Sequence, residues 1–208
     1  CSDTGKKATL LLADDAQAPG PVLDRLLPSI EHILRNSIAH GIETPAVRMA
    51  KNKPISGTVS ISVQHTGARV SFIVSDDGAG INTQKVLERA VSKGLAREDR
   101  AMSDQQIFGL LFKPGFSTAD SVSQLAGRGV GLDVVQHTVT EVGGSVSISS
   151  AQGHGTSFTL SVPSDISNMA VVPVAVGGAN FLIPANLVDR LLSLHGAAGE
   201  EATSITLE

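Results

Sequence analysis

Two histidines and an asparagine in the first quarter of the chain have side chains and a spacing that could do chemistry. His32, Asn36 and His40 follow one another at intervals of four residues in the stretch EHILRNSIAHGIE. A helix has about 3.6 residues per turn, so this spacing places all three on one helix face. Such a row could bind a metal ion, accept a phosphoryl group, contact phosphate or simply pack. A zinc site would need a third and a fourth ligand nearby, which this stretch lacks, so we do not favour zinc.

A second group of candidates follows a predicted strand in the stretch SDDGAG. Asp76, Gly78 and Gly80 form the pattern Asp-x-Gly-x-Gly. The glycines would let the backbone approach a ligand closely, and the Asp76 carboxylate would be a fixed acceptor suited to the exocyclic amine of adenine. Taken alone, the pattern is more typical of a turn that uses Asp and Gly for their turn preferences.

Two further glycine patterns occur later in the chain. Gly127, Gly129 and Gly131 in GRGVGLDVV precede a predicted helix, whose first N–H groups could bind phosphate. The stretch has neither the Lys-Ser/Thr of a Walker loop nor the spacing of a dinucleotide fingerprint. Gly155 and Thr156 in GHGTSF enter a predicted strand. Alone, the first pattern fits a flexible linker equally well, and the second is more typical of a hairpin turn.

The elements that must position these residues are predicted from hydrophobic periodicity. Apolar residues at helical spacing predict a helix from Val22, which Pro28 should kink or split and Gly41 should end. Strict alternation of apolar and polar residues predicts two hairpins. We expect strands at 8–13, 57–65, 69–76, 145–150 and 156–162, and helices at 45–52, 82–94, 103–112 and 130–142. This order predicts an α+β fold, a two-layer α/β sandwich with a mixed, mostly antiparallel sheet and helices on one face.

The composition of the chain argues against several classes of protein. The formal charge is −4 and aromatic residues are 3% of the chain, with no Trp or Tyr, which argues against a nucleic-acid surface. Cys1 is the single cysteine, so no internal disulfide is possible, and we expect a reducing, cytoplasmic setting. No apolar run reaches the roughly 18–20 residues of a membrane span. The chain begins without Met, so we expect a piece of a longer protein.

The character of the sequence changes after Pro163. We expect residues 1–163 to form one domain and residues 164–208 to be the incomplete start of a second, too short for a core of its own. The stretch 169–184 has a hairpin pattern, whereas the tail 195–208 has little pattern of any kind.

Taken together and in this order, the motifs resemble the ATP-binding fold shared by sensor histidine kinases, type II topoisomerases, a heat-shock chaperone and mismatch-repair proteins. The stretches HILRNSIAHGIE, DDGAGI, FKPGFSTADSV, GRGVGLDVV and GTSFTLSVP are more closely similar to the catalytic domain of chemotaxis histidine kinases of the CheA type. The resemblance covers about residues 6–163. The segment after Pro163 resembles the start of the CheW-like regulatory domain of such kinases.

The resemblance implies an ATP site with Mg²⁺. Asn36 matches the residue whose amide reaches Mg²⁺, and His40 matches a histidine near the phosphates. His32 stands where ordinary sensor kinases carry Glu, and the histidine that accepts phosphate in this family lies on a separate domain. Asp76 matches the aspartate that reads adenine, and Thr156 a residue that supports it.

Further residues match positions around the nucleotide. Lys85 and Arg89 match basic residues near the phosphates, although a solvated helix face explains them nearly as well. Arg35 matches another basic residue, for which a surface ion pair is the alternative. Residues 113–126 match a lid over ATP that Phe116 would anchor. The expected nucleotide contacts are Asp76, Gly78, Gly80, Lys85, Arg89, Phe116, Ser117, Thr118, Gly127, Arg128, Gly129, Val130, Gly131 and Thr156.

One position departs from the family. The chemotaxis kinases typically carry Asp where this chain has Ala39. A carboxylate near the Mg²⁺ shell is therefore missing, which would either weaken metal binding or mark a branch such as the kinases of type IV pilus motility. We favour the branch, because the other motif positions are intact.

The resemblance implies a protein histidine kinase of a two-component system in chemotaxis or type IV pilus motility. It would transfer the γ-phosphate of ATP to a histidine on a separate phosphotransfer domain, and a response regulator would receive it next. Further expected partners are a CheW-like coupling protein and a chemoreceptor array, with a homodimer for the full-length protein, no nucleic acid and no direct membrane insertion. The alternatives are a degenerate nucleotide-binding scaffold, which Ala39 would suit, and an ATP-driven conformational clamp.

Overall fold

The computed structural model describes residues 5–13, 18–97, 102–116, 131–164, 171–176, 179–184, 188–195 and 201–207. Contacts between residues divide the chain into two compact units, Cys1–Ser164 and Asp165–Glu208. The candidate residues all fall in the first unit. The assignment of the second unit as the start of a CheW-like domain stays a prediction.

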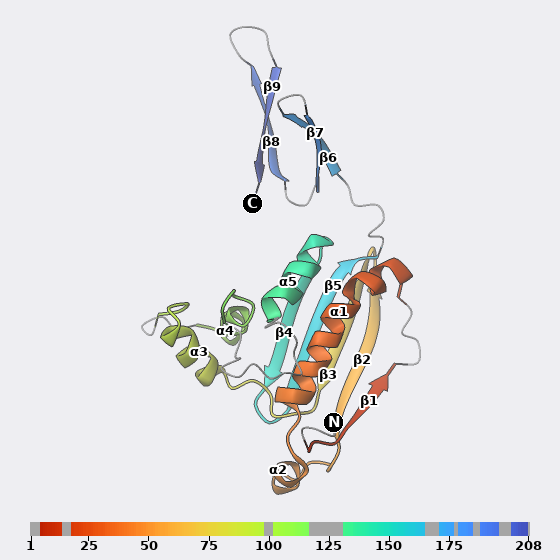
Figure 1. Ribbon diagram of the computed structural model, residues 1–208, viewed down its shortest axis with the longest axis vertical. Helices are drawn as coiled ribbons and strands as arrows, with labels where there is room; N and C mark the ends of the chain where they lie inside the picture. The colour runs from red at the N-terminus through yellow and green to blue at the C-terminus, as the bar shows by residue number, and fades with distance from the viewer. Residues whose placement is uncertain are drawn as a thin grey trace. The chain divides into compact units, whose positions relative to one another are not determined.

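Among the described residues, the first unit is built on a five-stranded sheet in the order β1-β2-β3-β5-β4 (Figure 1). Its strands are β1 (Ala8–Leu12), β2 (Gly57–Thr66), β3 (Arg69–Asp76), β4 (Ser145–Ala151) and β5 (Gly155–Pro163). β1 runs parallel to β2 and the other neighbouring pairs are antiparallel, which confirms the mixed, mostly antiparallel sheet. On β3, Val70, Phe72 and Val74 are buried at every second position, so one face of the sheet packs on the core.

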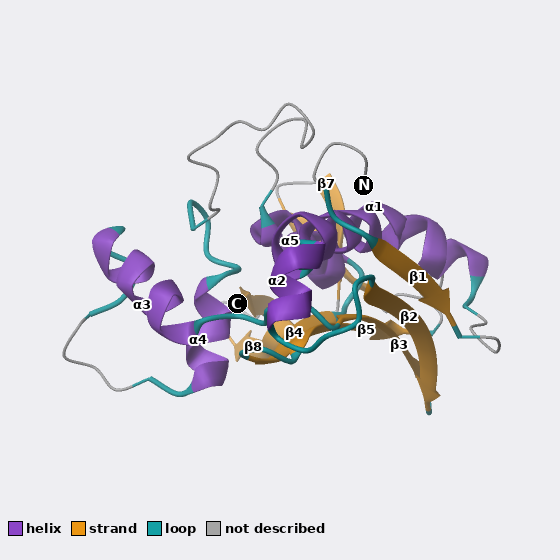
Figure 2. Cartoon of the chain, turned by 90° about the horizontal axis from the view of Figure 1, so that it is seen from below, coloured by secondary structure: helices purple, strands orange, loops and turns teal. Residues whose placement is uncertain are grey.

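Helices α1 (Gly20–Asn36) and α5 (Leu132–Glu141) cover one face of this sheet (Figures 1 and 2). They contact each other, and α5 also packs on β4 and β5. The buried apolar residues of the two helices are Val22, Leu26, Ile30, Ile33, Val135 and Val139. This layer of helix on sheet confirms the predicted α+β sandwich.

α1 passes through Pro28 as one continuous helix, so of the two expected effects of this residue, a kink or a split, the split does not occur. Pro28 and Asp24, whose carbonyl would have received the missing N–H, are both exposed, and water can replace the lost hydrogen bond. The helix then widens into a π turn, η2 (Ser37–Gly41), where the N–H of Ile42 donates to the carbonyl of Ser37 at 2.7 Å. Gly41 ends the helical segment as predicted.

Three shorter helices complete the first unit as the structure describes it: α2 (Pro45–Ala50), α3 (Thr83–Ser92) and α4 (Asp104–Leu110). Each begins where the sequence predicted. The Asn82 side chain caps α3 by accepting from the N–H of Lys85 at 2.9 Å, and Ser103 and Gln106 form a capping box at the start of α4. α3 and α4 pack against each other.

In the second unit, the described residues form two separate two-stranded sheets. β6 (Val171–Val176) pairs with β7 (Ala179–Pro184), which is the predicted hairpin. β8 (Val188–His195) pairs with β9 (Glu201–Leu207). The tail, which has little pattern in the sequence, thus contributes a strand: 201–207 contains Thr, Ile and Leu, which suit a strand once a partner supplies backbone hydrogen bonds. In the described parts of both units, no helix is long and apolar enough to span a membrane.

Candidate functional site

Asp76 is the last residue of β3, and its side chain is buried against two loops. The residue is 7% exposed, and its Oδ1 accepts a hydrogen bond from the N–H of Gly78 at 3.0 Å. Gly41 lies so close that a Cβ there would be 2.9 Å from Oδ2 of Asp76. The N–H of Ala79 donates to the carbonyl of Gly41 at 2.8 Å. The turn that follows Asn36 and the loop that follows Asp76 are therefore bonded directly to each other.

Gly78 and Gly80 are required by close backbone contacts. A Cβ on Gly78 would lie 2.2 Å from the carbonyl oxygen of Gly41, and one on Gly80 would lie 2.2 Å from that of Ala151. Gly80 also has φ +69°, which L side chains rarely adopt. The loop is thus held between η2 and the β4–β5 turn, and the fold itself requires both glycines, whether or not a ligand binds.

The charge of Asp76 is disfavoured in the free protein. Burial raises the pKa of the Asp76 carboxyl above its ordinary value, while the hydrogen bond from the backbone N–H of Gly78 acts against this shift. A carboxylate that is partly desolvated gains when a ligand brings a hydrogen-bond donor to it. This side chain can therefore select an amine such as that of adenine.

The neighbouring strand supplies a second polar group. Thr156 on β5 is the register partner of Asp76 and is also 7% exposed. Its Oγ1 lies 3.1 Å from Oγ of Ser150. The Ser150 Oγ accepts a hydrogen bond from the N–H of Ile81 at 2.8 Å and donates to the carbonyl of Gly155 at 2.9 Å. Ser150, which belongs to no recognisable motif, thus connects the loop after Asp76 to the β4–β5 turn.

His32, Asn36 and His40 lie on successive turns of α1 and η2, as their spacing predicted. His32 and Asn36 are half-buried, and His40 is exposed. Within the described part of the chain, no hydrogen bond holds the Asn36 side chain. These three residues are thus more accessible than Asp76.

The electrostatic surroundings of His32 favour its neutral form. Partial burial lowers the pKa of His32 and the charge of Arg35 lowers it further, while the carboxylate of Asp133 in the first turn of α5 acts in the opposite direction. Arg35 itself forms an exposed ion pair with Glu31 at 3.6 Å, the alternative that the sequence left open. Asp133, which the sequence analysis missed, shows that the start of α5 faces the His32 region.

Lys85 and Arg89 lie one helical turn apart on α3. They line a shallow hollow together with Glu88, Ser92 and Lys93. The main packing partner of α3 is α4, so this basic face belongs to a different part of the unit from the α1 row. The structure therefore groups Asp76, its glycines and Thr156 closely, and leaves the cations of α3 on a separate surface.

Phe116 is buried in a small cluster with Ala90 and Leu110 between α3 and α4. Beside it, the Lys93 Nζ donates to the carbonyl of Gly115 at 2.7 Å. These contacts fix the chain where the expected lid begins. The expected contacts Ser117, Thr118, Gly127, Arg128, Gly129 and Val130 lie outside the described residues, whereas Gly131 is the N-cap of α5.

The residues present fit a Mg²⁺ ion that has few protein ligands. Mg²⁺ prefers oxygen ligands and usually keeps several waters and substrate phosphates in its shell. The side-chain amide of Asn36, near the end of α1, carries an oxygen of this kind. No three His, Cys, Asp or Glu side chains in the described ranges gather closely enough to hold a metal ion by themselves. A Mg²⁺ ion here would have to share its shell with nucleotide phosphates.

Comparison with known proteins gives a consistent result. Residues 25–166 match the family described as histidine kinase-, DNA gyrase B- and HSP90-like ATPase. Chemotaxis protein CheA of Bacillus subtilis (strain 168) is 41% identical over 189 residues, which are 89% of this chain and 28% of that protein. Chemotaxis protein CheA of Salmonella typhimurium is 37% identical over 203 residues, 95% of this chain and 30% of that protein. The chain thus spans less than a third of the length of these relatives.

Among solved structures, the blue-light activated histidine kinase of Erythrobacter litoralis EL346 covers 76% of this chain with 35% of its own chain. The sequence identity is 16% and the TM-score is 0.42.

Proposed function

Because the chain belongs to the family of histidine kinase-, DNA gyrase B- and HSP90-like ATPases and its sequence is of the CheA type, we propose that it binds Mg-ATP and transfers the γ-phosphate to a histidine on a separate phosphotransfer domain. The observation that carries this proposal is the buried Asp76 carboxylate, joined through Ala79 and Gly41 to the turn that follows Asn36. Base recognition and metal binding would thereby be held at neighbouring points.

At the adenine end, Asp76 accepts a hydrogen bond from the exocyclic amine, and Thr156 beside it supports the same edge of the base. Gly78 and Gly80 keep the loop narrow enough for the carboxylate to stay in place. The buried carboxylate makes this contact selective, because an oxygen in place of the amine would face it without a donor.

At the phosphate end, Asn36 holds Mg²⁺, which would neutralise charge on the phosphates when bound. His32 and His40 contact phosphate, and the first N–H groups of α5 after Gly131 favour an anion. Lys85 and Arg89, which lie on the separate surface of α3, are not part of this set. The groups in this set hold the γ-phosphate in line with the incoming imidazole nitrogen; a new N–P bond forms as the P–O bond to the β-phosphate breaks, and ADP leaves.

The rest of the proposal concerns the protein to which this chain belongs. Residues 164–208 would begin a CheW-like regulatory domain of a dimeric, cytoplasmic kinase. Its partners would be a coupling protein, a chemoreceptor array and a response regulator. No described contact favours the degenerate scaffold or the conformational clamp over the kinase.

The test is a transfer assay with γ-labelled ATP, Mg²⁺ and a purified phosphotransfer domain of a CheA relative. We expect labelled phosphohistidine on that domain. ADP binding is measured separately by calorimetry, so that a failure of transfer is not confused with a failure to fold. Tight ADP binding without transfer to any such domain would contradict the kinase proposal and support a nucleotide-binding scaffold.

A further inference from the structure

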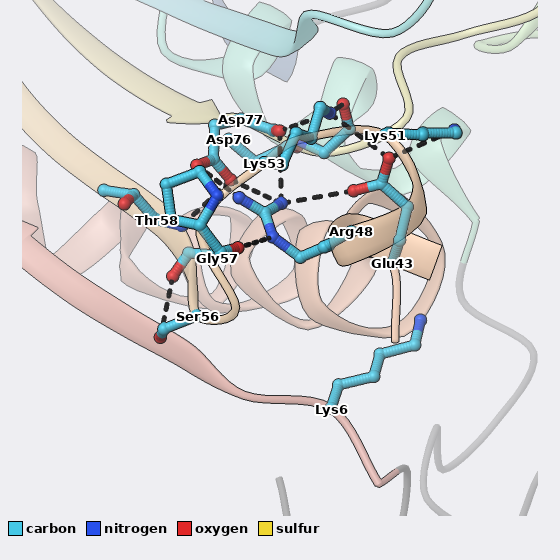
Figure 3. A network of polar contacts seen from close by, with 12 residues as sticks. Lys6, Glu43, Arg48, Lys51, Lys53, Ser56, Gly57, Thr58, Asp76 and Asp77 are labelled. Atoms are coloured by element: carbon cyan, nitrogen blue, oxygen red, sulfur yellow. Dashed lines mark hydrogen bonds and ion pairs between the residues drawn. The ribbon is translucent and has the colours of Figure 1, made fainter. Parts of the chain in front are cut away.

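A cluster of charged residues contacts the loop that follows Asp76, residues 77–81, which we call the adenine loop, and has no part in the nucleotide contacts named above (Figure 3). Its centre is Arg48 of α2, whose side chain is 0% exposed. The guanidinium donates to Glu43 at 3.2 Å, to both carboxylate oxygens of Asp77 at 3.0 and 2.8 Å, and to the carbonyl of Pro54 at 2.6 Å. A buried charge is tolerated when paired in this way, and it fixes the geometry of its partners.

Two lysines join this cluster at the same carboxylate. The Nζ atoms of Lys51 and Lys53 lie 3.3 and 3.2 Å from Oε1 of Glu43. Burial acts to raise the pKa of Glu43, but hydrogen bonds from Lys53, from the Glu43 backbone and from Lys51 together outweigh it and lower the pKa below its ordinary value. The Glu43 carboxylate therefore holds both lysine side chains beside it.

The two lysines differ in what else they touch. The Nζ of Lys53 also donates to the carbonyl oxygens of Asp77 at 2.9 Å and of Gly78 at 2.7 Å. Lys51 has no such contact among the described residues, and its side chain is 47% exposed against 17% for Lys53. Lys53 therefore holds the backbone of the adenine loop, whereas Lys51 holds only Glu43.

The carbonyls that Lys53 holds belong to the residues that set the position of Asp76. The N–H of Gly78 is the donor to Oδ1 of Asp76, and it belongs to the same residue whose carbonyl Lys53 binds. On the other side, the Asp77 carboxylate accepts from the N–H of Thr58 at 2.9 Å. The carboxylates of the two consecutive aspartates therefore differ in function: that of Asp77 binds Arg48 and the backbone of Thr58, and that of Asp76 stays available to a ligand.

We propose that Lys53, supported by Arg48, is a positioning residue that determines base specificity by fixing the Asp77–Gly78 backbone and thereby the Asp76 carboxylate. The inference rests on the proposed role of Asp76 in reading adenine. A hydrogen bond between carboxylate and amine tolerates a displacement of only a few tenths of an ångström, so loosening this backbone weakens the contact without removing either partner. Lys53 acts through Asp76 and touches no nucleotide itself.

The experiment compares ADP with inosine diphosphate, in which a carbonyl oxygen replaces the exocyclic amine. Affinities are measured by calorimetry for wild type, Lys53→Met and Lys51→Met, the last being the matched control because it also removes a cation from Glu43. In wild type, ADP should bind at least tenfold more tightly than inosine diphosphate. Lys53→Met should lose about tenfold in ADP affinity and keep its affinity for inosine diphosphate, and Lys51→Met should change neither.

A purely structural role for Lys53 would weaken both nucleotides alike, so an unchanged ratio of the two affinities in Lys53→Met overturns the proposal. If Lys53→Met does not fold, Lys53→Gln is measured in the same way, and its ratio of ADP affinity to inosine diphosphate affinity must also fall below that of wild type. Lys53→Arg, which keeps a cationic donor, should restore part of the ratio. A wild type that binds ADP and inosine diphosphate equally would contradict the adenine role of Asp76 itself, and this inference with it.

Discussion

The adenine end and the phosphate end of the proposed nucleotide site are built in opposite ways. At the adenine end Asp76 is buried, and the loop after it is hydrogen bonded to η2 through Ala79 and to β4 through Ser150. At the phosphate end His40 is exposed, and no described residue holds the Asn36 side chain. A loop bonded on both sides has one geometry, whereas accessible side chains can adapt to the ligand that they meet.

From this difference we expect the adenine end to control nucleotide affinity and the phosphate end to control the rate of phosphoryl transfer. The preformed end would select the base in the ground state. The accessible end would form its strongest contacts only when the γ-phosphate moves toward the acceptor. Substitutions at the two ends should therefore change different quantities.

The largest effect is expected for Asn36→Ala, which removes the proposed Mg²⁺ ligand. Transfer to the phosphotransfer domain should fall about 100-fold, the size typical of a lost contact in the transition state. ADP affinity without Mg²⁺ should stay within about twofold, and the thermal midpoint should move little because the side chain is accessible. Asn36→Asp is the control, since it keeps an oxygen ligand and should retain more activity. Normal transfer in Asn36→Ala would rule out the ligand role.

The next effect is expected for Asp76→Asn at the preformed end. ADP affinity should fall about tenfold, because the acceptor oxygen stays but its charge is lost. The free energy of unfolding, in contrast, should not fall in the variant. The pKa of Asp76 is raised on folding, so ionisation of Asp76 in wild type lowers the free energy of unfolding as the pH rises above 3.8. Thermal unfolding at pH 7 should therefore show the variant no less stable than wild type. A clear loss of stability would mean that Asp76 serves the fold and not the ligand.

His32 should link nucleotide binding to pH. In the free protein the pKa of His32 is lowered from 6.5, so protonation of His32 lowers the free energy of unfolding as the pH falls below 6.5. The phosphates of a bound nucleotide would raise the pKa of His32 again. Binding of ATP should therefore take up protons, and the affinity should rise a few-fold as the pH is lowered toward 6. Calorimetry in buffers of different ionisation enthalpy measures this uptake. In His32→Gln the uptake should disappear; if it persists, another group is responsible.

The smallest effect is expected for Ala39→Asp, which restores the carboxylate common among chemotaxis kinases. Ala39 is exposed on η2, and its carbonyl accepts a hydrogen bond from Lys6 at 2.6 Å, so a new side chain can be accommodated. The Mg²⁺ concentration at half-maximal transfer should fall about twofold, because an exposed charge contributes little. An unchanged midpoint would show that the metal shell is complete without this carboxylate.

The sequence predicted those parts of the fold that local periodicity controls. The alternation in β2 and β3 and the periodicity of α3 and α4 depend on residues close together in the chain, so the positions of these elements could be inferred directly. Whether Pro28 would split the helix could not be inferred from the sequence, because this depends on the exposure of Pro28 and Asp24, which only the packed structure shows. The strand 201–207 was missed because it depends on pairing with β8 more than on its own pattern.

The candidate site shows the same limit. Asp76, Gly78 and Thr156 could be found because they belong to motifs, and the structure does bring them together. Arg48, Lys53 and Ser150 carry no such motif. Their importance comes from hydrogen bonds to residues 24, 25, 29 and 69 positions away, which a single sequence does not show.

The most direct test of the division between the two ends measures the transfer rate against ATP concentration for wild type, Asp76→Asn and Asn36→Ala side by side. We expect Asp76→Asn to raise KM about tenfold and keep kcat, whereas Asn36→Ala lowers kcat about 100-fold and keeps KM. If both variants instead changed KM and kcat in the same proportion, the two ends would not act separately, and the proposed division between them would be wrong.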